Sequence, residues 1–585
     1  MKSLFKIFTI FTPKQLRYCI FIVFCMVIGA MLEAVGIGAI LPLISIMGQP
    51  DFLPMHPLIA HYASLAGITT HINFIIVCAA ALGVVYVLKN AYIAWETKLQ
   101  IDFSMKNQIY YSKQLLAEYF AKPYMYHLNH NSATLLRNMN SSGAIVFSSI
   151  LVPTLTLFTE VITAVTIWLM LVIVDSFTAI VVAGIMGGMV YVIMKFFRKK
   201  ISHAGIIQNK YSTEYIKWVN QGLGAIKETK ILHKEAFFLT EFDKSYARYG
   251  EANRKFMFLN QVPRLIIETI VVIALLVLII VKSLLGYEPM EIVPLLGVLA
   301  LAAFRLMPSA NRIVNLSNGI KFQMPLFDEL YDEFIKIKKR KINNVQILMD
   351  NDIKKMNFEN EIRVEHLQFK YPEGKSNVLK DVSFVIPKGK FVGIIGHTGA
   401  GKTTFVDILL GLLEPTGGRI LVDGADIFSN IRGWQMNLAY VPQSIYLIDG
   451  TIKENIALGI SAQDIDTKHI DRVLKMAELY EFVQALPDGM DTMVGERGVK
   501  LSGGQRQRIG IARALFTSPT VLILDEATSA LDNDTERHIT DTVLRLKGEI
   551  TIIAIAHRIS TLKNCDFKIK FMNQNVKIFN DEDVI

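Results

Sequence analysis

Long apolar runs characterise the first half of the chain, and short ones characterise the second half. From residue 359 onward, β-branched runs such as FVGIIG, LAYVPQ and TIIAIAH alternate with helical stretches and glycine turns. This alternation predicts an α/β domain with a largely parallel sheet. Before residue 320, six stretches are long and apolar enough to cross a hydrocarbon core of about 30 Å. They predict membrane spans near residues 18–44, 73–95, 144–174, 177–195, 264–282 and 292–312.

Composition supports two parts of different character. The 585-residue chain is 52% hydrophobic and only 19% charged, which is too apolar for an ordinary soluble protein. We expect a six-helix, all-α transmembrane domain over residues 1–335, a lysine-rich linker over 336–358 and the α/β domain over 359–585. The connections after the second and fourth spans are long, polar and rich in helix-forming residues. Spans two to five are therefore expected to continue as helices well below the bilayer.

Lysine and arginine predict the orientation of the spans. The segment before the first span holds four of them, the loop 49–72 holds none, and residues 195–255 hold thirteen. Positive residues favour the cytoplasmic side, so both termini are expected in the cytoplasm. The net charge of +9 does not suggest nucleic acid binding. The cysteines show neither metal-ligand spacing nor a disulfide framework, and we interpret them as small apolar residues: Cys19, Cys25, Cys78 and Cys565.

The segment GHTGAGKTT matches the phosphate-binding pattern G-x-x-x-x-G-K-[ST]. It follows the predicted strand FVGIIG and opens the predicted helix TTFVDILLGLL, which is the context that the pattern requires. Its glycines let backbone N–H groups close around phosphate oxygens at a helix N-terminus. Lys402 is expected to reach the β and γ phosphates, and the Thr403 hydroxyl is expected to bind Mg²⁺. The candidate nucleotide-binding residues are Gly396, His397, Thr398, Gly399, Ala400, Gly401, Lys402, Thr403 and Thr404.

A second apolar strand, in VLILDEA, ends in two carboxylates. Such a run is common by itself, but at this distance after a phosphate-binding loop it is not. Asp525 is expected to hold Mg²⁺ through water, and Glu526 is expected to act as the general base on the attacking water. The sequence therefore predicts an ATP-hydrolysing site with Mg²⁺ as its metal.

Between these motifs lies LSGGQRQR, and here the chain resembles the ATP-binding cassette (ABC) transporters. Six spans followed by one cassette is the layout of an exporter half-transporter. The resemblance implies a type I ABC exporter fold and ATP hydrolysis coupled to transport. The signature of the family caps a helix whose N-terminus meets the γ-phosphate held by the other subunit. In this chain the signature contains Ser502, Gly503, Gly504 and Gln505.

The resemblance also assigns residues outside these motifs. It implies that Tyr371 stacks on adenine, that Gln443 senses the nucleotide and its metal, and that His557 contacts the γ-phosphate. Asp532 ends the family segment SALD and belongs to the nucleotide site. Gln443 and His557 therefore join Glu526 as candidate catalytic residues. Because these elements are all intact, we expect a second copy of the same chain as partner, in a homodimer with two competent ATP sites.

Three further segments resemble parts of exporters. TMVGERG (492–498) is similar to the exporter segment just before the signature. FAKPYMYHL (120–128) and QGLGAIKETKIL (221–232) lie about where exporters place their coupling helices. A helical surface loop with solvated lysines is the alternative interpretation of the last two.

Arginines in the predicted spans give the best indication of the cargo, because ionisable residues inside a membrane are costly and usually functional. Arg305 and Arg312 are seven residues apart in the sixth span, which places them and Ser309 on one helix face. Arg264 lies at the cytoplasmic start of the fifth span, at a membrane depth comparable to that of Arg305 and Arg312. An arginine at such a depth costs about 2.5–3.5 kcal/mol unless it faces water, an acid or an anion. Guanidinium is well suited to phosphate, which it binds through two parallel hydrogen bonds.

Other interpretations of these arginines stay open at this point. Arg312 can extend to the membrane interface, and Arg305 can pair with an acid. Arg264 can pair with Glu268 one turn further along the same helix. No role follows for the remaining ionisable residues of the spans that we considered, Glu33, Lys89 and Glu160.

A narrower resemblance concerns the cargo. FRLMPSANRI, with VPRLIIE upstream, is similar to bacterial flippases that move undecaprenyl-pyrophosphate-linked oligosaccharides. It implies that Arg264, Arg305 and Arg312 contact the pyrophosphate of an anionic lipid-linked glycan. It also implies a multi-pass protein of the bacterial inner membrane that contacts membrane lipid. Its ATPase domain would lie in the cytoplasm. The loop 50–68 is long enough for the short outer helix of these flippases, or is an ordinary linker. Export of drugs, other lipids or peptides is the alternative function.

Overall fold

The computed structural model of the chain consists of two compact units. One comprises Met1–Lys122 and Asn129–Met349, and the other comprises Pro123–Leu128 and Asp350–Ile585. The structure describes residues 6–39, 70–139, 143–174, 176–284, 289–339, 344–349 and 352–526. It also describes residues 536–537, 540–541, 544–555, 565–572 and 574–580, with isolated residues between 40 and 70. The predicted outer helix in the loop 50–68 lies almost wholly outside these residues.

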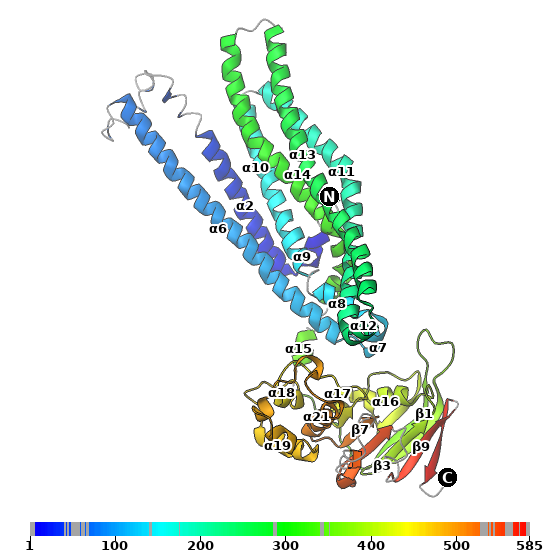
Figure 1. The fold of residues 1–585 in the computed structure, drawn as a ribbon. Helices are drawn as coiled ribbons and strands as arrows, with labels where there is room; N and C mark the ends of the chain where they lie inside the picture. The colour runs from blue at the N-terminus through cyan, green and yellow to red at the C-terminus, as the bar shows by residue number, and fades with distance from the viewer. Residues whose placement is uncertain are drawn as a thin grey trace. The chain divides into compact units, whose positions relative to one another are not determined.

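The first unit is a bundle of long helices (Figure 1). The predicted membrane spans fall on α2 (Pro13–Gly38), α6 (His71–Phe120), α10 (Val152–Val174), α11 (Ser176–Gly224), α13 (Glu235–Leu284) and α14 (Pro289–Lys339). Shorter elements precede or connect them. These are the 3₁₀ helix η1 (Lys6–Ile10), α8 (Ser132–Arg137), α9 (Gly143–Val146), the π-helical turn η3 (Phe147–Leu151), α12 (Ile226–Ile231) and α15 (Asn344–Met349).

Helix length explains how the bundle extends beyond a membrane. The helices α6, α11, α13 and α14 have 49 to 51 residues, roughly 75 Å at about 1.5 Å per residue and more than twice the hydrocarbon thickness. The expected extensions are therefore present for spans two, four and five, and α14 of span six is equally long. Span three differs, because α10 has 23 residues and begins after the short elements α8, α9 and η3. Within the described residues, four segments are long and apolar enough to cross a membrane: Pro13–Gly36, His71–Phe120, Gly143–Leu169 and Glu235–Val281. The other two predicted spans, on α11 and α14, run partly through residues whose side chains are not described.

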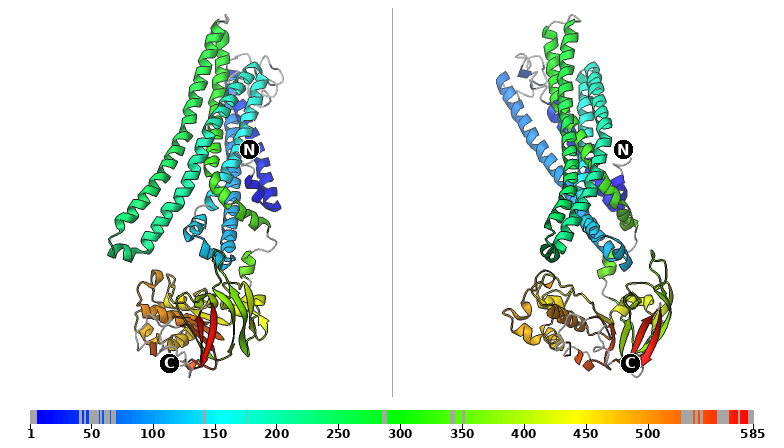
Figure 2. Two further views of the ribbon diagram at one scale, coloured as in Figure 1. Left: turned by 90° about the vertical axis from the view of Figure 1, so that its right-hand side faces the viewer. Right: turned by 45° about the vertical axis from the view of Figure 1, so that its right-hand side comes forward.

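The helices pack pairwise around small apolar cores. α11 packs along both α13 and α14, and α10 packs against α14 and α2. Figure 2 shows the hairpin of α11 and α13, which α12 joins, from two sides. Ile201, Ile267 and Val314 are fully buried between α11, α13 and α14. At Gly205 a side chain would collide with the backbone oxygen of Phe322, so this glycine allows α11 and α14 to touch backbone to backbone.

A buried arginine joins three helices of this unit. Arg137, at the end of α8, is only 5% exposed. Its guanidinium donates hydrogen bonds to Asn209 and Thr213 on α11 and forms an ion pair with Glu329 on α14. Asn209 also donates to Glu329, at 2.9 Å. Arg137, Asn209, Thr213 and Glu329 all take part in this network, so it connects α8, α11 and α14.

The helical unit extends into the segment predicted as a linker. α14 ends at Lys339 and carries Lys336, Lys338 and Lys339 in its last turn, where the helix dipole favours positive charge. The first residues of the predicted linker 336–358 are therefore helical. α15 follows, and the two units divide between Met349 and Asp350.

Two β-sheets form the framework of the second unit. The antiparallel sheet has the order β2 (Leu379–Pro387), β1 (Glu361–Phe369), β4 (Gly417–Val422), β5 (Ala425–Asp426). The second sheet has the order β10 (Asn575–Asn580), β9 (Phe567–Met572), β3 (Phe391–Gly396), β8 (Thr551–Ile555), β7 (Val521–Asp525), β6 (Leu438–Val441). Its strands run parallel except for β10. The predicted strands FVGIIG, LAYV, VLILD and TIIAI are all in this second sheet.

Helices and two apolar cores complete the second unit. The helices are α16 (Lys402–Leu409), α17 (Ile431–Gln435), α18 (Ile452–Ile456), α19 (Thr467–Met476), α20 (Tyr480–Gln484) and α21 (Gly503–Phe516), with the short 3₁₀ turns η4 (Ile427–Asn430), η5 (Gly489–Asp491) and η6 (Glu496–Gly498). Side chains of the second sheet contribute to both cores, for example Leu522 to one and Ile523 to the other. The strand β7 is buried along its whole length. It is therefore a rigid support for the acids at its end.

One short helix from the first half of the chain belongs to this unit. Pro123–Leu128 groups with the second unit, and it contains most of α7 (Tyr124–Asn129). Met125 packs against the same core as Tyr440. The predicted coupling segment 120–128 contains most of this helix, whereas the other predicted segment, 221–232, contains the end of α11 and all of α12.

Candidate functional site

The phosphate loop connects the buried strand β3 to the N-terminus of α16. Gly396 and Gly401 both have positive φ, of 152° and 96°. A Cβ would lie 2.6 Å from the Phe571 oxygen at Gly396 and 2.8 Å from the Leu379 side chain at Gly401. Both positions therefore require glycine, for backbone conformation and for space. The first N–H groups of α16 have no acceptor within the helix and are available to an anion.

Lys402 lies over this loop. Its side chain is largely buried, and Nζ donates hydrogen bonds to the backbone oxygens of Gly396 at 2.7 Å and His397 at 3.1 Å. Burial lowers the pKa of Lys402, while the carboxylates of Glu526 and Asp525 raise it. The ammonium group is thus held between the loop and the acidic end of β7, where a phosphate would meet it.

Asp525 is the last residue of β7 and lies among several polar side chains. The Tyr440 hydroxyl donates a hydrogen bond to its Oδ2 at 3.1 Å. Burial raises the pKa of Asp525, the Tyr440 hydrogen bond and Lys402 lower it, and Glu526 raises it. Burial also raises the pKa of Asp407 on α16 to about 6, with the charge of Asp525 adding to the effect. These carboxylates favour a cation at this place, because a positive charge would stabilise both as anions.

Glu526 follows directly and turns toward Gln443. Its φ of 50° is unusual for glutamate, and its N–H donates to the Ile555 oxygen at 3.0 Å. The Gln443 Nε2 donates to the Glu526 Oε2 at 2.6 Å. The structure therefore brings together two of the three predicted catalytic residues. The third, His557, lies outside the described residues, as does Asp532.

Tyr371 lies beside the end of the phosphate loop. Its hydroxyl is 3.3 Å from the Thr404 Oγ1, and its ring meets the ring of Phe369 edge to face at 4.9 Å between centroids. The loop residues, Tyr371, Asp525, Glu526 and Gln443 thus form one polar site in this unit.

The signature residues begin α21. Ser502 accepts a hydrogen bond from the Gln505 N–H at 3.2 Å, and the Gln505 side chain accepts one from the Ser502 N–H at 2.8 Å. This capping box engages the N–H groups of Ser502 and Gln505. The N–H groups of Gly503 and Gly504 have no acceptor within the helix. Among the described residues, no hydrogen bond or ion pair links Ser502, Gly503, Gly504 or Gln505 to the phosphate loop. Within a single chain the signature and the phosphate loop are therefore not joined into one site.

The residues present fit MgATP. The phosphate loop offers backbone donors and an ammonium group, Asp525 offers a carboxylate that gains from a nearby cation, and Thr403 lies in the first turn of α16. Thr403, Gln443 and Asp525 are the residues that would hold the metal, which neutralises charge on the phosphates when bound. Among the described residues there is no cluster of three or more His, Cys, Asp or Glu side chains suited to holding a metal by itself. The phosphates would therefore have to contribute ligands.

Comparison with known proteins agrees with this geometry. Residues 379–529 match the family model described as ABC transporter. A bacterial Atm1-family ABC exporter with ATP bound has a similar structure, with a TM-score of 0.72 and 22% identity over 94% of this chain and 95% of that one. The chain has the fold of an ABC exporter. The expected fold class, type I with six extended helices before a P-loop domain, is thereby confirmed.

Sequence relatives match a smaller part of the chain. An ATP-dependent lipid A-core flippase of Nitrosococcus oceani is 45% identical over 206 residues, which is 35% of this chain and 34% of that protein. A putative multidrug export ATP-binding/permease protein of Bacillus subtilis, YgaD, is 36% identical over 263 residues, 45% of this chain and 44% of that protein. The chain spans between 16% and 44% of the length of the curated relatives it matches.

The membrane arginines of this exporter fold have different surroundings. Arg312 forms an ion pair with Glu160 on α10, with Nε 3.1 Å from Oε1. The Glu160 side chain is 9% exposed and that of Arg312 is 53% exposed. Ser309, which is buried, hydrogen-bonds to Glu160 as well. An internal acid is therefore a partner of Arg312 in this structure, an arrangement that was considered from sequence for Arg305.

The other two arginines lie on different helices. Arg264 is exposed on α13, and no ion pair with the equally described Glu268 is present. Arg305 is within α14, but its side chain lies outside the described residues. The structure therefore does not gather the three arginines into one described cluster.

Sequence reasoning missed several polar groups near both sites. Tyr440 and Asp407 carry no motif of their own, and only the fold brings them to Asp525. Glu160 was noticed without a role, because a partner on another helix leaves no trace in local spacing. Glu96 on α6 is 2% exposed and fits against Gly29 of α2, where a Cβ would lie 2.6 Å from its carboxylate. The available signal was that Glu96 directly follows the predicted second span, 73–95, in sequence.

Proposed function

We propose that the chain is one half of an ATP-driven exporter that flips a lipid. The observation that carries this proposal is a single polar site, formed by the phosphate loop, Asp525, Glu526 and Gln443, in a chain that also has the membrane bundle of an ABC exporter. Relatives named as lipid A-core flippases support a lipid as cargo.

The geometry supports a separate role in ATP hydrolysis for each residue of the site. The phosphate loop and Lys402 hold the phosphates, and the carboxylate of Asp525 faces the metal position. Glu526 accepts the proton of the water that attacks the γ-phosphorus, while the bond from that phosphorus to the ADP oxygen breaks. Gln443 holds the Glu526 carboxylate in place through the 2.6 Å hydrogen bond. ADP and inorganic phosphate are the products.

A second copy of the chain supplies the missing half of each ATP site. In one chain the capped N-terminus of α21 is not connected to the phosphate loop, yet its free N–H groups suit a γ-phosphate. A symmetric dimer that places Ser502 of one copy against the phosphate loop of the other completes two equivalent sites. ATP then favours the closed dimer and hydrolysis releases it, which drives the membrane helices between two states.

The finer proposal for the cargo is a polyprenyl-pyrophosphate-linked oligosaccharide, moved from the cytoplasmic to the outer leaflet of a bacterial inner membrane. Its support is the guanidinium of Arg312, which Glu160 holds by the Nε edge and which is half exposed. Arg264 and Arg305 are the further candidates for contact with the pyrophosphate. Guanidinium groups in a span suit a doubly charged phosphate group better than they suit a neutral drug.

Flipping in proteoliposomes tests this function. The native protein is expected to move a polyprenyl-pyrophosphate glycan in an ATP-dependent manner, and Arg305→Ala is expected to lose flipping while it retains ATP hydrolysis. Transport of a hydrophobic dye without transport of the glycan would show that the cargo is of another class. Absence of ATP hydrolysis by the native protein would refute the proposal as a whole.

A further inference from the structure

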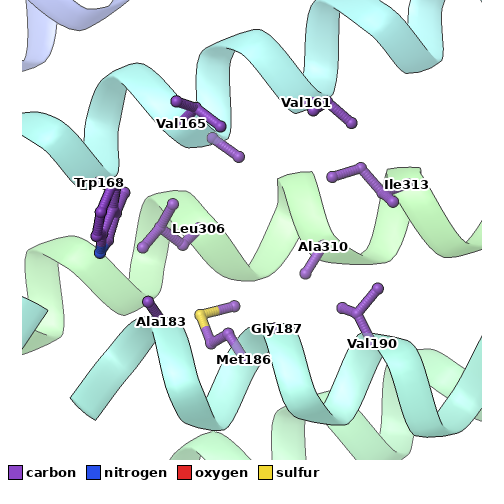
Figure 3. Close-up of a pocket in the computed structure, with 11 residues that line it drawn as sticks. Val161, Val165, Trp168, Ala183, Met186, Gly187, Val190, Leu306, Ala310 and Ile313 are labelled. Carbon is purple, nitrogen blue, oxygen red and sulfur yellow. The ribbon is translucent and has the colours of Figure 1, made fainter. Parts of the chain in front are cut away.

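A cavity of about 300 Å³ lies between α10, α11 and α14, and its lining is apolar (Figure 3). Trp168 and Leu306 lie at one end, and Val161 and Ile313 lie at the other. Gly187 contributes part of the wall from α11. Val161 and Trp168 are seven positions apart, which corresponds to a rise of roughly 10 Å along α10. The cavity is therefore a narrow slot along the helix axes, entirely within the helical unit.

A charged pair marks one end of this slot. Val161 follows Glu160 in sequence and Ile313 follows Arg312, and these two neighbours form the 3.1 Å ion pair between α10 and α14. Glu160 and Arg312 are not among the residues that line the slot, but each is adjacent in sequence to a lining residue at this end, and the Arg312 side chain is half exposed. An apolar slot with an exposed guanidinium near one end matches a molecule with an apolar chain and an anionic group.

Positive charge increases further along the same helices. Lys195, Arg198, Lys199 and Lys200 follow the slot on α11, and all four are exposed. Arg198 lies eleven residues after Gly187, which is close to a whole number of turns and places it on nearly the same face. Lys321 of α14 is near Arg198: burial lowers the pKa of Lys321, the charge of Arg198 adds to this effect, and the carboxylate of Asp328 opposes it.

We propose that this slot holds the hydrocarbon chain of the phosphate-bearing lipid that the protein flips, with the lipid phosphate on the side of Arg312. The inference rests on the proposed function and adds a site for the chain. By the positive-inside rule, the end with Arg312 and the basic residues of α11 faces the cytoplasm, where the cargo begins its path. A chain that moves from bilayer to protein gains little hydrophobic free energy. The slot therefore serves to orient the lipid, and its shape selects among chains.

The glycines of α11 allow this slot to be filled without damage to the bundle. A Cβ at Gly187 meets nothing within 4 Å, so a larger side chain there enters the slot rather than a neighbouring helix. Gly184 on the same helix is equally open but does not line the slot. Gly187→Leu and Gly184→Leu are thus a matched pair that differs in occupancy of the slot.

Flipping of two probes by these variants tests the proposal. The probes are a long-chain polyprenyl-pyrophosphate disaccharide and a methyl-pyrophosphate disaccharide that lacks the hydrocarbon chain, in proteoliposomes that contain the full-length protein. Gly187→Leu is expected to reduce flipping of the long-chain probe about tenfold, while the methyl analogue moves at the native rate. Gly184→Leu is expected to match the native protein with both probes. ATP hydrolysis is expected to remain at the native level in both variants, which also shows that they are folded.

Three results would overturn the inference. Native flipping of the long-chain probe by Gly187→Leu would show that the slot does not hold the cargo chain. An equal loss for both probes would show that the slot serves the bundle and not the chain. Loss of native ATP hydrolysis in Gly187→Leu but not in Gly184→Leu would likewise assign the slot to the bundle. If the native protein moves neither probe, the proposed function itself fails, and this outcome is distinct from the other three.

Discussion

At the residue scale, the reactive groups depend on positions that local sequence does not define. Glu526 has a left-handed backbone conformation, which costs on the order of 1–3 kcal/mol and persists where the surroundings impose it. Here the buried strand β7 and the hydrogen bond from the Glu526 N–H to Ile555 impose it. The carboxylate consequently points to Gln443 rather than along the strand.

Replacing Glu526 tests its role as the base. We expect Glu526→Gln to lower the rate of ATP hydrolysis about 10²–10⁴-fold, because the amide accepts no proton from water. ATP binding is expected to persist, since the phosphate loop is unchanged. Phosphate release and nucleotide binding measure the two effects, with Glu549→Gln, an exposed acid, as control. Hydrolysis at the native rate would remove Glu526 from the mechanism.

Replacing Glu160 and replacing Arg312 are expected to affect KM for the lipid-linked glycan differently. Glu160→Gln removes the acid that competes for the guanidinium, so KM for the lipid-linked glycan is expected to fall or stay constant. Arg312→Gln removes the cation and is expected to raise this KM about tenfold. It also leaves Glu160 buried without its ion-pair partner, so we expect a lower Tm for this variant. A KM that rises equally in both variants would mean that the pair matters only for packing.

Asp407 gives a pH-dependent prediction. Its pKa is raised from 3.8 to about 6, so between these values the folded protein binds a proton that the unfolded chain releases. This group therefore reduces stability increasingly as pH rises from about 4 to about 6. Asp407→Asn is expected to match the native Tm near pH 4 and to exceed it at pH 7. Asp449→Asn, at an exposed site, serves as control; equal differences at both pH values would contradict the assignment.

At the element scale, long helices are held together by a few buried polar contacts. The network around Arg137 connects α8, α11 and α14, although these elements are separated by up to 192 residues in sequence. Arg137 is almost fully buried while Glu329 is 35% exposed. Removing the arginine leaves Asn209, Thr213 and Glu329 without a common donor, so the three helices lose a shared connection.

Thermal unfolding of the purified protein tests this connection. Arg137→Met is expected to destabilise the helical unit by about 2–3 kcal/mol, less than a fully buried pair because Glu329 reaches solvent. Lys244→Met breaks an exposed pair with Glu241 and is expected to change stability by less than about 0.5 kcal/mol. Similar melting curves for both variants would show that the Arg137 network is not a stabilising link.

At the scale of the whole molecule, the proposed function combines two copies of the chain. The capping box of α21 and the phosphate loop are each well formed, and within one copy no contact between described residues joins them. In the proposed dimer, the N-terminus of α21 in one copy meets the phosphate loop of the other.

Mixed dimers test this arrangement. A dimer of one Lys402→Ala copy and one Ser502→Arg copy contains one site with both defects and one intact site if the sites form between copies. We expect about half of the native ATP hydrolysis per dimer. Each variant alone is expected to be inactive as a homodimer. Inactivity of the purified mixed dimer would instead favour sites formed within single copies.

Much of the architecture followed from patterns within short windows of sequence. Apolar runs located the long helices, and the strands FVGIIG, LAYV, VLILD and TIIAI are where β-branched runs placed them. The phosphate loop could be recognised from sequence because its glycines, Lys402 and Thr403 lie close together and belong to one local backbone structure. Local periodicity and local motifs are sufficient for such features, since each depends on neighbours within about ten residues.

Tertiary structure alone decided which distant groups meet. It paired Glu160 with Arg312 across 152 positions, brought the Tyr440 hydroxyl to Asp525 across 85, and formed the apolar slot between α10, α11 and α14. It also carried α14 through Lys339, into the segment that composition suggested as a linker. Contacts of this kind depend on how helices and strands pack, and packing is a property of the whole fold. The sequence by itself determined the elements and the chemistry of the ATP site, and the fold determined which partners their side chains have.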